Sequence, residues 1–475
     1  MSRDFPESIQ EALPSAKRVA DVRKKFEKSG VKYVLCCWID MLGIPKTKPV
    51  PIEEWEGLCA GKGPQFAVHS VSMVPDAGPA DPDQITVPDL DSAEVCPWDN
   101  RYGWVIADLY HGDTKPYRMC PRTVLRRQIK KAKDAGYKFF TGFEPEFIIM
   151  RPLENGQLWK AFDDDPLPGE GFRPKRQPYG YDVEFTLDQM PYVSEVIDIL
   201  NSLGWGVKDV VAEGSYSQIE LDFDYSDMLT TADRFIFLRI LLKEMAKERG
   251  LIATFMPKPT TGDWRSASHI NTSVQSTKGA GKNLLQGKDG TWSDLTFNML
   301  GGLIKHGKAI CGVSCPTVNS YKGLVDYVPG LEGGTSTWAP THITYGINNR
   351  SAMYRLPQTR FAIENRAADL TMNVYMAFAM HIAASLEGIT KKMPPPKPTN
   401  ISLYDADKEA LKKAGVLRTP ATLQEAIHEI RADPMSKQVI GETLLDCWLT
   451  YKQDEWDRYY TTVSEWEREE YTRFF

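Results

Sequence analysis

Two segments of the chain alternate polar and apolar residues with the period of a β-strand, and both carry glutamates on the polar face. In the segment 143–147 (FEPEF), Glu144 and Glu146 share one face and the phenylalanines share the other. In the segment 217–224 (SQIELDFD), Glu220 lies on the polar face. Because neighbouring carboxylates raise each other's pKa, placing them together is costly unless a cation neutralises them. The alternation therefore predicts a β-sheet with an acidic face.

Two further segments extend this polar face. His269, Asn271 and Ser273 fall on one side of a third strand-like segment, and Glu364 and Arg366 stand two residues apart in a fourth. A carboxylate-rich surface of this kind suits a hard divalent cation such as Mg²⁺ or Mn²⁺. A sheet that is merely solvated on one face explains the same alternation, and periodicity alone does not separate the two interpretations.

Arginines are concentrated just before and within the fourth segment, at Arg350, Arg355, Arg360 and Arg366. Guanidinium groups bind phosphate and carboxylate oxygens in pairs, so the cluster favours a phosphate-bearing ligand, although arginine runs are often solvated surface. The sequence has no GxxxxGK[ST] loop and no Rossmann fingerprint. A nucleotide would therefore be held without a P-loop.

The length of 475 residues exceeds what one hydrophobic core usually supports, which predicts two domains. A small sheet-rich region is expected over 1–118 and a larger α+β region over 119–475, with the boundary just before a clear amphipathic helix. The helices are expected at 16–28, 123–135, 189–203 and 231–249, and the strands at 137–150, 216–224, 252–256 and 267–274.

The bulk properties exclude several classes of partner. A net charge of −6 gives no general attraction for nucleic acid or anionic lipid. No apolar run approaches the length of a membrane span, and the N-terminus has no signal-peptide pattern, so we expect a cytoplasmic chain without nucleic-acid or membrane partners. The eight cysteines show no CxxC spacing and are expected to be free thiols.

A series of ordered motifs resembles the glutamine synthetase superfamily across almost the whole chain. The matching residues are FEPEF (143–147), Glu213, Glu220, TFMPKP (254–259), His269, NSYK (319–322), NNRSA (348–352) and ENRAAD (364–369). The segment SEWEREEY (464–471) is similar to the end of the bacterial amine-ligase branch, the γ-glutamylmethylamide and γ-glutamylanilide synthetases.

This resemblance implies a fold and a reaction. The fold is an N-terminal β-grasp domain followed by a catalytic domain, in which an antiparallel sheet forms a half-barrel active site with packed helices. The assembly is a dodecamer of two hexameric rings with active sites between subunits. In the reaction, ATP phosphorylates the side-chain carboxylate of glutamate with two or three Mg²⁺ or Mn²⁺ ions per site, and an amine displaces the phosphate.

The resemblance also implies roles for individual residues. Glu146, Glu213 and Glu220 would bind one metal, and Glu144, His269 and Glu364 the other. Arg350 and Arg355 would face the ATP phosphates, together with Ser273 and Arg360, although Arg360 stands four residues before Glu364 where the family usually has two. Arg366 would face the reacting carboxylate. Asp40, lent by the neighbouring subunit, would orient or deprotonate the amine.

Three departures from the family pattern lie in the substrate-binding segments. The segment 264–271 lacks the Asn-Gly pair that helps to bind glutamate, and Gly323 replaces an arginine that binds its α-carboxylate. Arg265 is the candidate replacement, unless the acid substrate is not glutamate. Trp338 replaces the flap glutamate that binds ammonium, close to Gly333 and Gly334. An indole favours an apolar or aromatic group.

These departures leave three functions open: an organic-amine ligase acting on alkylamines or aromatic amines, a glutamine synthetase using ammonia, and a catalytically silent scaffold. Retention of all six metal ligands argues against the scaffold, and Trp338 favours the organic amine. Tyr404 stands where some bacterial glutamine synthetases are adenylylated, and here a structural role is favoured.

Overall fold

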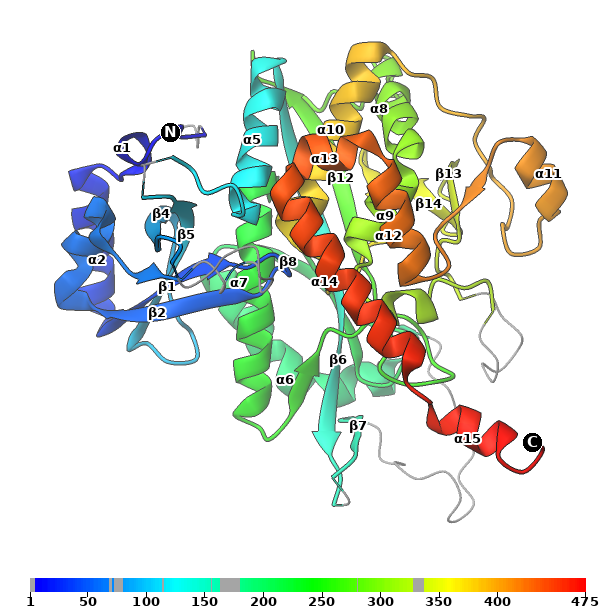
Figure 1. Ribbon diagram of the computed structural model, residues 1–475, viewed down its shortest axis with the longest axis horizontal. Coiled ribbons are helices and arrows are strands. Elements are labelled where there is room, and N and C mark those ends of the chain that lie inside the picture. The colour runs from blue at the N-terminus through cyan, green and yellow to red at the C-terminus, as the bar shows by residue number, and fades with distance from the viewer. Residues whose placement is uncertain are drawn as a thin grey trace.

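The computed structural model describes residues 5–67, 71, 80–112, 115–154, 156–162, 180–279, 281–327 and 337–475, which form two sheets with surrounding helices (Figure 1). The N-terminal sheet has the strand order β2-β1-β5-β4-β3. Its strands are β1 (Tyr33–Ile39), β2 (Pro45–Pro51), β3 (Gln65–Phe66), β4 (Gln84–Val95) and β5 (Tyr102–Tyr110). Strands β1 and β5 are parallel, and the other pairs in this sheet are antiparallel.

Helix α2 (Ala16–Ser29) packs on this sheet. Ser15 caps its first turn and Gly30, with φ of +84°, ends it. Phe26 is fully buried and meets the Trp55 ring edge-on at 5.5 Å. Short elements complete the region: α1 (Ile9–Ala12), a 3₁₀ turn (Ile52–Glu54), α3 (Trp55–Gly57) and a π turn (Leu58–Lys62). One helix on one sheet is the arrangement that the β-grasp expectation describes.

The large sheet has the strand order β16-β13-β14-β15-β12-β6-β9-β8, and the short strands β7, β10 and β11 also pair with β6. The strands are β6 (Tyr137–Pro152), β7 (Leu158–Lys160), β8 (Val207–Ala212), β9 (Gln218–Phe223), β10 (Ser226–Asp227), β11 (Ile252–Thr254), β12 (Ser268–Ser276), β13 (His342–Ile347), β14 (Ala352–Leu356), β15 (Ile363–Asn365) and β16 (Leu417–Arg418). The expectation of an antiparallel sheet is confirmed except for β13 and β14, which run parallel.

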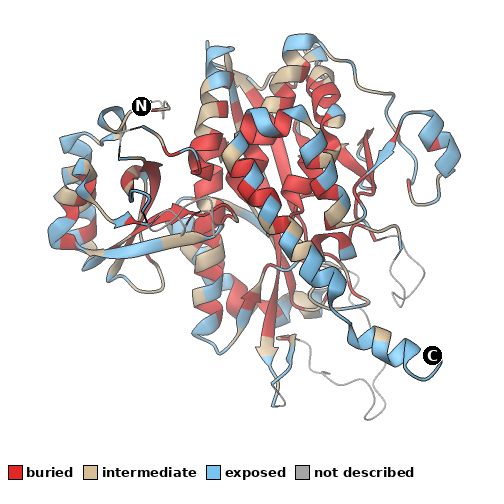
Figure 2. Cartoon of the chain, in the orientation of Figure 1, coloured by how far each residue is buried: buried red, intermediate tan, exposed pale blue. Residues whose placement is uncertain are grey.

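Helices cover the large sheet and surround α10 (Val374–Lys391), most of which is buried. Figure 2 shows this burial at the centre of the molecule, whereas the outer face of α2 and most of α15 are exposed. The remaining helices are α5 (Pro121–Asp134), α6 (Val183–Ser202), α7 (Met228–Lys247), α8 (Asp294–Lys305), α9 (Gly307–Ser314), α11 (Lys408–Lys413), α12 (Leu423–Ala432), α13 (Pro434–Ile440), α14 (Glu442–Thr461) and α15 (Glu465–Tyr471). The NSYK motif forms a 3₁₀ turn (Asn319–Lys322).

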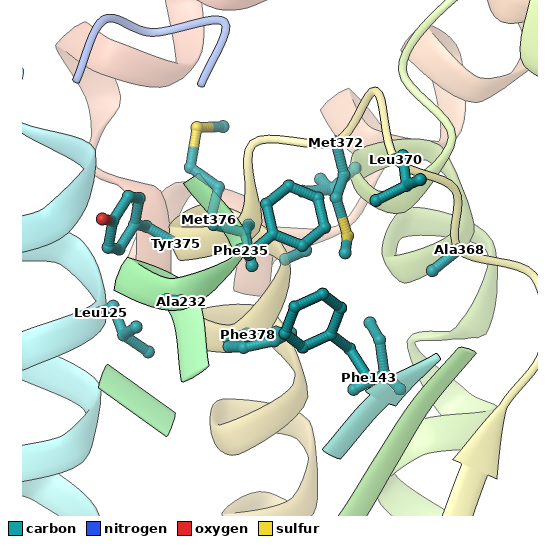
Figure 3. Packing of buried hydrophobic residues seen from close by; sticks show 14 of the residues in the cluster. Leu125, Phe143, Ala232, Phe235, Ala368, Leu370, Met372, Tyr375, Met376 and Phe378 are labelled. Atoms are coloured by element: carbon teal, nitrogen blue, oxygen red, sulfur yellow. The ribbon is translucent and has the colours of Figure 1, made fainter. Parts of the chain in front are cut away.

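The apolar face of β6 fixes the direction of its acidic face. Phe143 lies 4.9 Å from the ring of Phe223 and 5.4 Å from that of Phe235 on α7. Figure 3 shows Phe143 in the same cluster as Phe378 of α10. Because successive strand residues point to opposite faces, this packing directs Glu144 to the other side of the sheet.

The α+β class and every predicted helix and strand are confirmed, with ends shifted by a few residues. Helix α5 begins at Pro121, close to the predicted division between residues 118 and 119. That division itself stays a prediction. None of the helices in the described part of the chain is both long enough and apolar enough to cross a bilayer.

Candidate active site

Strand pairing brings the predicted metal ligands together. Strand β12 places His269 directly opposite Glu144 of β6, and β9 places Glu220 directly opposite Glu146. Strand β15 pairs with the other edge of β12 and brings Glu364 to the same face. The ligands come from four strands that are distant in sequence and adjacent in the sheet.

These side chains form two overlapping groups. The ligand atoms of Glu144, His269 and Glu364 all lie within 4.8 Å of one another, as do those of Glu146, Glu220 and His269. His269 Nδ1 is 3.0 Å from Glu144 Oε2, and its Nε2 is 3.6 Å from Glu146 Oε1. The imidazole therefore stands between the two groups, whereas the sequence assigned it to one. Glu213, predicted to complete the second group, follows β8 and acts electrostatically on Glu146.

Burial and mutual repulsion raise the pKa of two of these carboxyls, those of Glu146 and Glu220. Burial, with the Glu213 charge adding to it, raises the pKa of Glu146 to about 8. Burial and the neighbouring Glu146 raise the pKa of Glu220 well above its usual range. Carboxylate oxygens with one imidazole nitrogen form a donor set that suits a divalent cation, which would supply the missing positive charge. The donor set therefore fits the expected metal ions.

Glu364 is compensated by arginines instead. Its Oε1 accepts a 2.5 Å bond from Arg366 and its Oε2 a 2.8 Å bond from Arg355, while Arg360 lies 3.6 Å away. Burial alone would raise the pKa of Glu364, but the Arg366 charge and its neighbours lower it to about 2. Arg360 also donates to Glu144 Oε1 at 2.8 Å. Its longer spacing from Glu364 does not remove it from the site.

The arginine motif places its members at different depths. Arg366 is buried, and its Nε donates to the Arg350 carbonyl oxygen at 3.0 Å. Arg350 itself is exposed. Arg355 is held by Asn348, whose Oδ1 accepts bonds of 3.2 and 2.6 Å from it. Ser273 lies on β12, half-buried, on the same strand face as His269. The arginines and Ser273 can therefore face an anionic ligand from one side of the two acidic groups around His269.

Sequence reasoning did not select the neutral residues that orient the acids. Gln218 Nε2 donates to Glu146 Oε2 at 3.2 Å, and the Ala267 amide donates to the same oxygen at 2.8 Å. Asn271 Nδ2 donates to Glu144 Oε1 at 2.8 Å. The period of a strand could have indicated both residues, because residues two apart share a face: Gln218 stands two residues from Glu220, and Asn271 stands two residues from His269. Asn348 had a signal in the NNRSA motif.

Arg265 occupies the space beside Gly323. A side chain at position 323 would meet Arg265 carbons at 2.5 to 2.7 Å, so the glycine gives room to the arginine. The guanidinium turns inward, where its Nη2 donates to the Ala367 carbonyl oxygen at 2.6 Å and lies 3.3 Å from Asp369 Oδ2. Gly323 thus leaves room for the Arg265 side chain, whose ion-pair partner Asp369 is buried.

Asp40 lies in the turn between β1 and β2. Its Oδ1 accepts bonds of 2.9 Å from the amides of Leu42 and Ile44, and Lys46 Nζ lies 3.4 Å from its Oδ2. Its side chain has no exposed surface within this chain. This geometry gives Asp40 Oδ1 a role in the turn, and the predicted role of Asp40 towards the amine stays a prediction.

Trp338 projects from the chain between two buried neighbours. It is 52% exposed, whereas Thr337 and Ala339 are buried. The Tyr404 hydroxyl donates to the Ala339 carbonyl oxygen at 2.8 Å, which gives Tyr404 the structural role that the sequence favoured. The flap residues Gly333 and Gly334 lie outside the described residues.

Residues 118–471 match the family model for the glutamine synthetase catalytic domain, and the chain belongs to that family. It is accordingly a carbon–nitrogen ligase, of a family whose members use ATP and divalent metals.

Among its relatives is the glutamate–methylamine ligase of Methyloversatilis universalis, 33% identical over 96% of this chain and 99% of the relative. The glutamine synthetase of Methanocaldococcus jannaschii is 32% identical over 94% of this chain and 96% of the relative. The solved GmaS–ADP complex, conformation 1, superposes with a TM-score of 0.84 at 30% identity, over 95% of this chain and 99% of GmaS. The chain thus resembles both an organic-amine ligase and ammonia-using enzymes.

Proposed function

We propose that this ligase joins the γ-carboxylate of glutamate to an organic amine such as methylamine, isopropylamine or aniline. In the first step, a γ-carboxylate oxygen attacks the terminal phosphorus of ATP, the bond from that phosphorus to the ADP oxygen breaks, and ADP departs, giving γ-glutamyl phosphate. In the second, the amine nitrogen attacks the acyl carbon and loses a proton, and phosphate departs with the C–O bond electrons. The products are a γ-glutamyl amide, ADP and phosphate.

The arginines and acids support the activation step. Phosphoryl transfer depends on positioning and on compensation of negative charge more than on covalent help. Arg350, Arg355 and Arg360 supply guanidiniums for the phosphates, and Arg366, held by Glu364 and the Arg350 carbonyl, is fixed for the reacting carboxylate. Two or three Mg²⁺ or Mn²⁺ ions, bound by the two groups around His269, would neutralise the ATP phosphates and polarise the transferring group.

The exposed indole of Trp338 is the observation that carries the choice of acceptor. It is presented to solvent by buried neighbours, and Ala339 is tied to Tyr404, which feels the charge of Arg366. These contacts connect the loop that carries Trp338 to the surroundings of Arg366, which supports a place for the indole at the acceptor side of the reaction. An indole offers an apolar face and a π-surface but no negative charge, so it suits an alkyl or aryl group better than ammonium.

The test is ADP release with glutamate and a panel of methylamine, isopropylamine, aniline and ammonium. The specificity constant should be higher for at least one organic amine than for ammonium. Trp338→Glu should shift the preference towards ammonium, Trp338→Phe should largely retain the organic amine, and Trp466→Ala, which removes an exposed indole from α15, should change neither. A native preference for ammonium would instead support the glutamine synthetase alternative. Absence of ADP release with every amine would support the silent scaffold.

We also propose that Arg265 supplies the positive charge that Gly323 has lost, with glutamate as the acid. Loss of one charge-assisted contact costs about 1.5 to 3 kcal/mol, so Arg265→Ala should raise the KM for glutamate by roughly 10- to 100-fold. Asp369→Asn keeps the arginine and should leave that KM low. If both variants only lower thermal stability, Arg265 is a structural residue and the identity of the acid is open.

The active unit is proposed to be a dodecamer of two hexameric rings. The family membership of residues 118–471 supports this assembly. Light scattering after gel filtration, followed by single-particle imaging, would establish the number of subunits. A monomer with full ligase activity would contradict it.

A further inference from the structure

The segment 399–404, here called the tether, connects two loops of the site. At one end it is bonded to the turn 348–351, here called the arginine turn because it contains Arg350. Asn349 Nδ2 in this turn donates to the carbonyl oxygens of Thr399 and Ile401 at 2.7 and 2.9 Å. At the other end, the Tyr404 hydroxyl donates to the Ala339 carbonyl oxygen at 2.8 Å. The tether follows a proline-rich linker and forms no helix or strand of its own, so these side-chain bonds fix its position.

The loop that receives Tyr404 has an unfavourable backbone at its functional residue. Trp338 has a φ of +56°, in the left-handed region that residues with a Cβ rarely adopt. Such a conformation persists only where the surroundings determine it. Thr337 Oγ1 donates to the Val325 carbonyl oxygen and accepts from the Ala339 amide, while the Tyr404 hydroxyl donates to the Ala339 carbonyl oxygen and also interacts with the Thr337 side chain. The indole is thus presented by anchors on both neighbours.

Tyr404 also lies near the charge that acts on the substrate. The Arg366 guanidinium is close enough to lower the pKa of the hydroxyl, although burial dominates and raises that pKa overall. The tether therefore spans from the arginine turn, past Arg366, to the loop that carries Trp338.

We propose that Tyr404 is a positioning residue that sets the preference for organic amines by holding Trp338 in its left-handed conformation. The inference rests on the proposed function, since it assigns a residue to the amine selectivity of the same site. Without the hydroxyl, the 337–339 backbone can relax to a more common conformation and withdraw the indole. Recognition of the amine then weakens, while binding of ATP and glutamate is retained.

The experiment compares Tyr404→Phe with the native enzyme in ADP release, under saturating ATP and glutamate. Loss of one hydrogen bond predicts a rise of about 5-fold in the KM for methylamine and a similar fall in the methylamine-to-ammonium ratio of specificity constants. The KM values for ATP and glutamate should change by less than about 2-fold. Tyr33→Phe, which alters an exposed ring of β1, is the matched control and should change none of these values.

A double-mutant cycle separates positioning from general stability. If Tyr404 acts through Trp338, Tyr404→Phe should have almost no further effect on the methylamine KM in the Trp338→Ala enzyme. Equal effects in both backgrounds would overturn the inference. If Tyr404→Phe does not fold, Thr337→Val removes the anchor on the other side and should produce the same change.

The outcomes also distinguish this inference from the proposed function. A native enzyme that prefers ammonium would remove the proposed function. A native enzyme that prefers an organic amine, with an unchanged amine ratio in Tyr404→Phe, would overturn the role of Tyr404 alone.

Discussion

Two groups of buried and half-buried charged side chains differ in how completely the protein compensates their charges. The first, the structural cluster, joins the N-terminal sheet to the helices of the larger region, and it consists of Asp89, Asp108, Arg122, Arg126 and Asp233. The second, the acidic cluster, lies on the large sheet and consists of Glu144, Glu146, Glu220, His269 and Glu364.

The structural cluster is organised around one arginine. Arg122 has no exposed surface, and its guanidinium donates to Asp233 at 3.0 and 2.9 Å, to Asp108 at 2.8 Å and to Asp89 at 2.6 Å. Tyr375 of α10 adds a 2.9 Å bond to Asp233. Strands β4 and β5, together with helices α5, α7 and α10, meet at this point. Charge-assisted bonds in this planar fork satisfy the carboxylates without any added ion.

The acidic cluster is satisfied on one side only. Glu364 is bonded to arginines and its pKa falls to about 2, whereas burial and a neighbouring carboxylate raise the pKa of Glu146 to about 8. A protein that needed only stability would pair both sides. The structural cluster thus has its charges compensated within the chain, whereas the acidic cluster has a donor set that fits the divalent metals used by the family.

Removal of Arg122 tests the first half of this comparison. Arg122→Leu would leave two buried carboxylates, Asp108 and Asp233, and the half-buried Asp89 with reduced compensation, and breaking a buried ion pair costs about 3 to 5 kcal/mol. We expect the free energy of unfolding in urea to fall by that amount, equally with and without Mg²⁺. Arg101→Leu, at an exposed ion pair, is the control and should leave the urea midpoint unchanged. If Mg²⁺ restored the free energy of unfolding of the Arg122→Leu protein, Arg122 would belong to the metal site.

Removal of Glu220 tests the second half. Glu220→Gln should lower kcat/KM by at least about 100-fold. Substitution of residues that only contact a metal ligand already costs up to that factor, and the loss of a ligand should cost at least as much. Stability in EDTA should stay the same or rise, because a carboxyl whose ionised form is repelled by its neighbours has been removed. Glu409→Gln, on the exposed helix α11, should change neither quantity. A fall in stability comparable to that of Arg122→Leu would erase the distinction between the clusters.

The dependence of metal binding on pH sharpens the comparison further. The folded-state pKa of Glu146, about 8, lies above its ordinary value of 4.5. In metal-free protein, the contribution of this carboxyl to the free energy of unfolding is therefore fully present below pH 4.5 and is lost as the pH rises through 8. A cation must displace the proton, so the Kd for Mn²⁺ should fall by about 50-fold from pH 6 to pH 8. Calorimetry in buffers of different ionisation enthalpy would detect the released protons. Glu146→Gln should lessen the dependence, and binding without proton release would contradict it.

The smallest effect is expected at the edge of the structural cluster. Tyr375→Phe removes one hydrogen bond to Asp233, which keeps its two bonds to Arg122. The free energy of unfolding should fall by about 1 kcal/mol, with unchanged KM for every substrate. Urea unfolding and steady-state kinetics measure the two quantities. A loss as large as that of Arg122→Leu would mean that Tyr375, rather than the arginine, organises the cluster.

Local pattern was sufficient for the strands of the site. The alternation in 143–147 and 217–224 fixes which residues share a face, because the period of a strand is two whatever it pairs with. The same logic explains why α2 and α5 were predicted near their observed ends: Ser15 and Gly30 bound the first, and Gly136 follows the second. Family motifs added the ligand assignments, including that of Glu213.

The sequence by itself determined the α+β class, the family and the acidic face on which a ligase of this kind depends. Only the tertiary structure showed that Arg122 gathers three aspartates, that Arg265 turns to Asp369, and that Asp40 is buried in its own turn. These outcomes depend on contacts between segments that lie far apart in the chain. Such contacts decide which partner lies within bonding distance of a buried charge. Periodicity records the face on which a side chain lies; the direction of its charged end is decided by packing and by the cost of burying that charge without a partner.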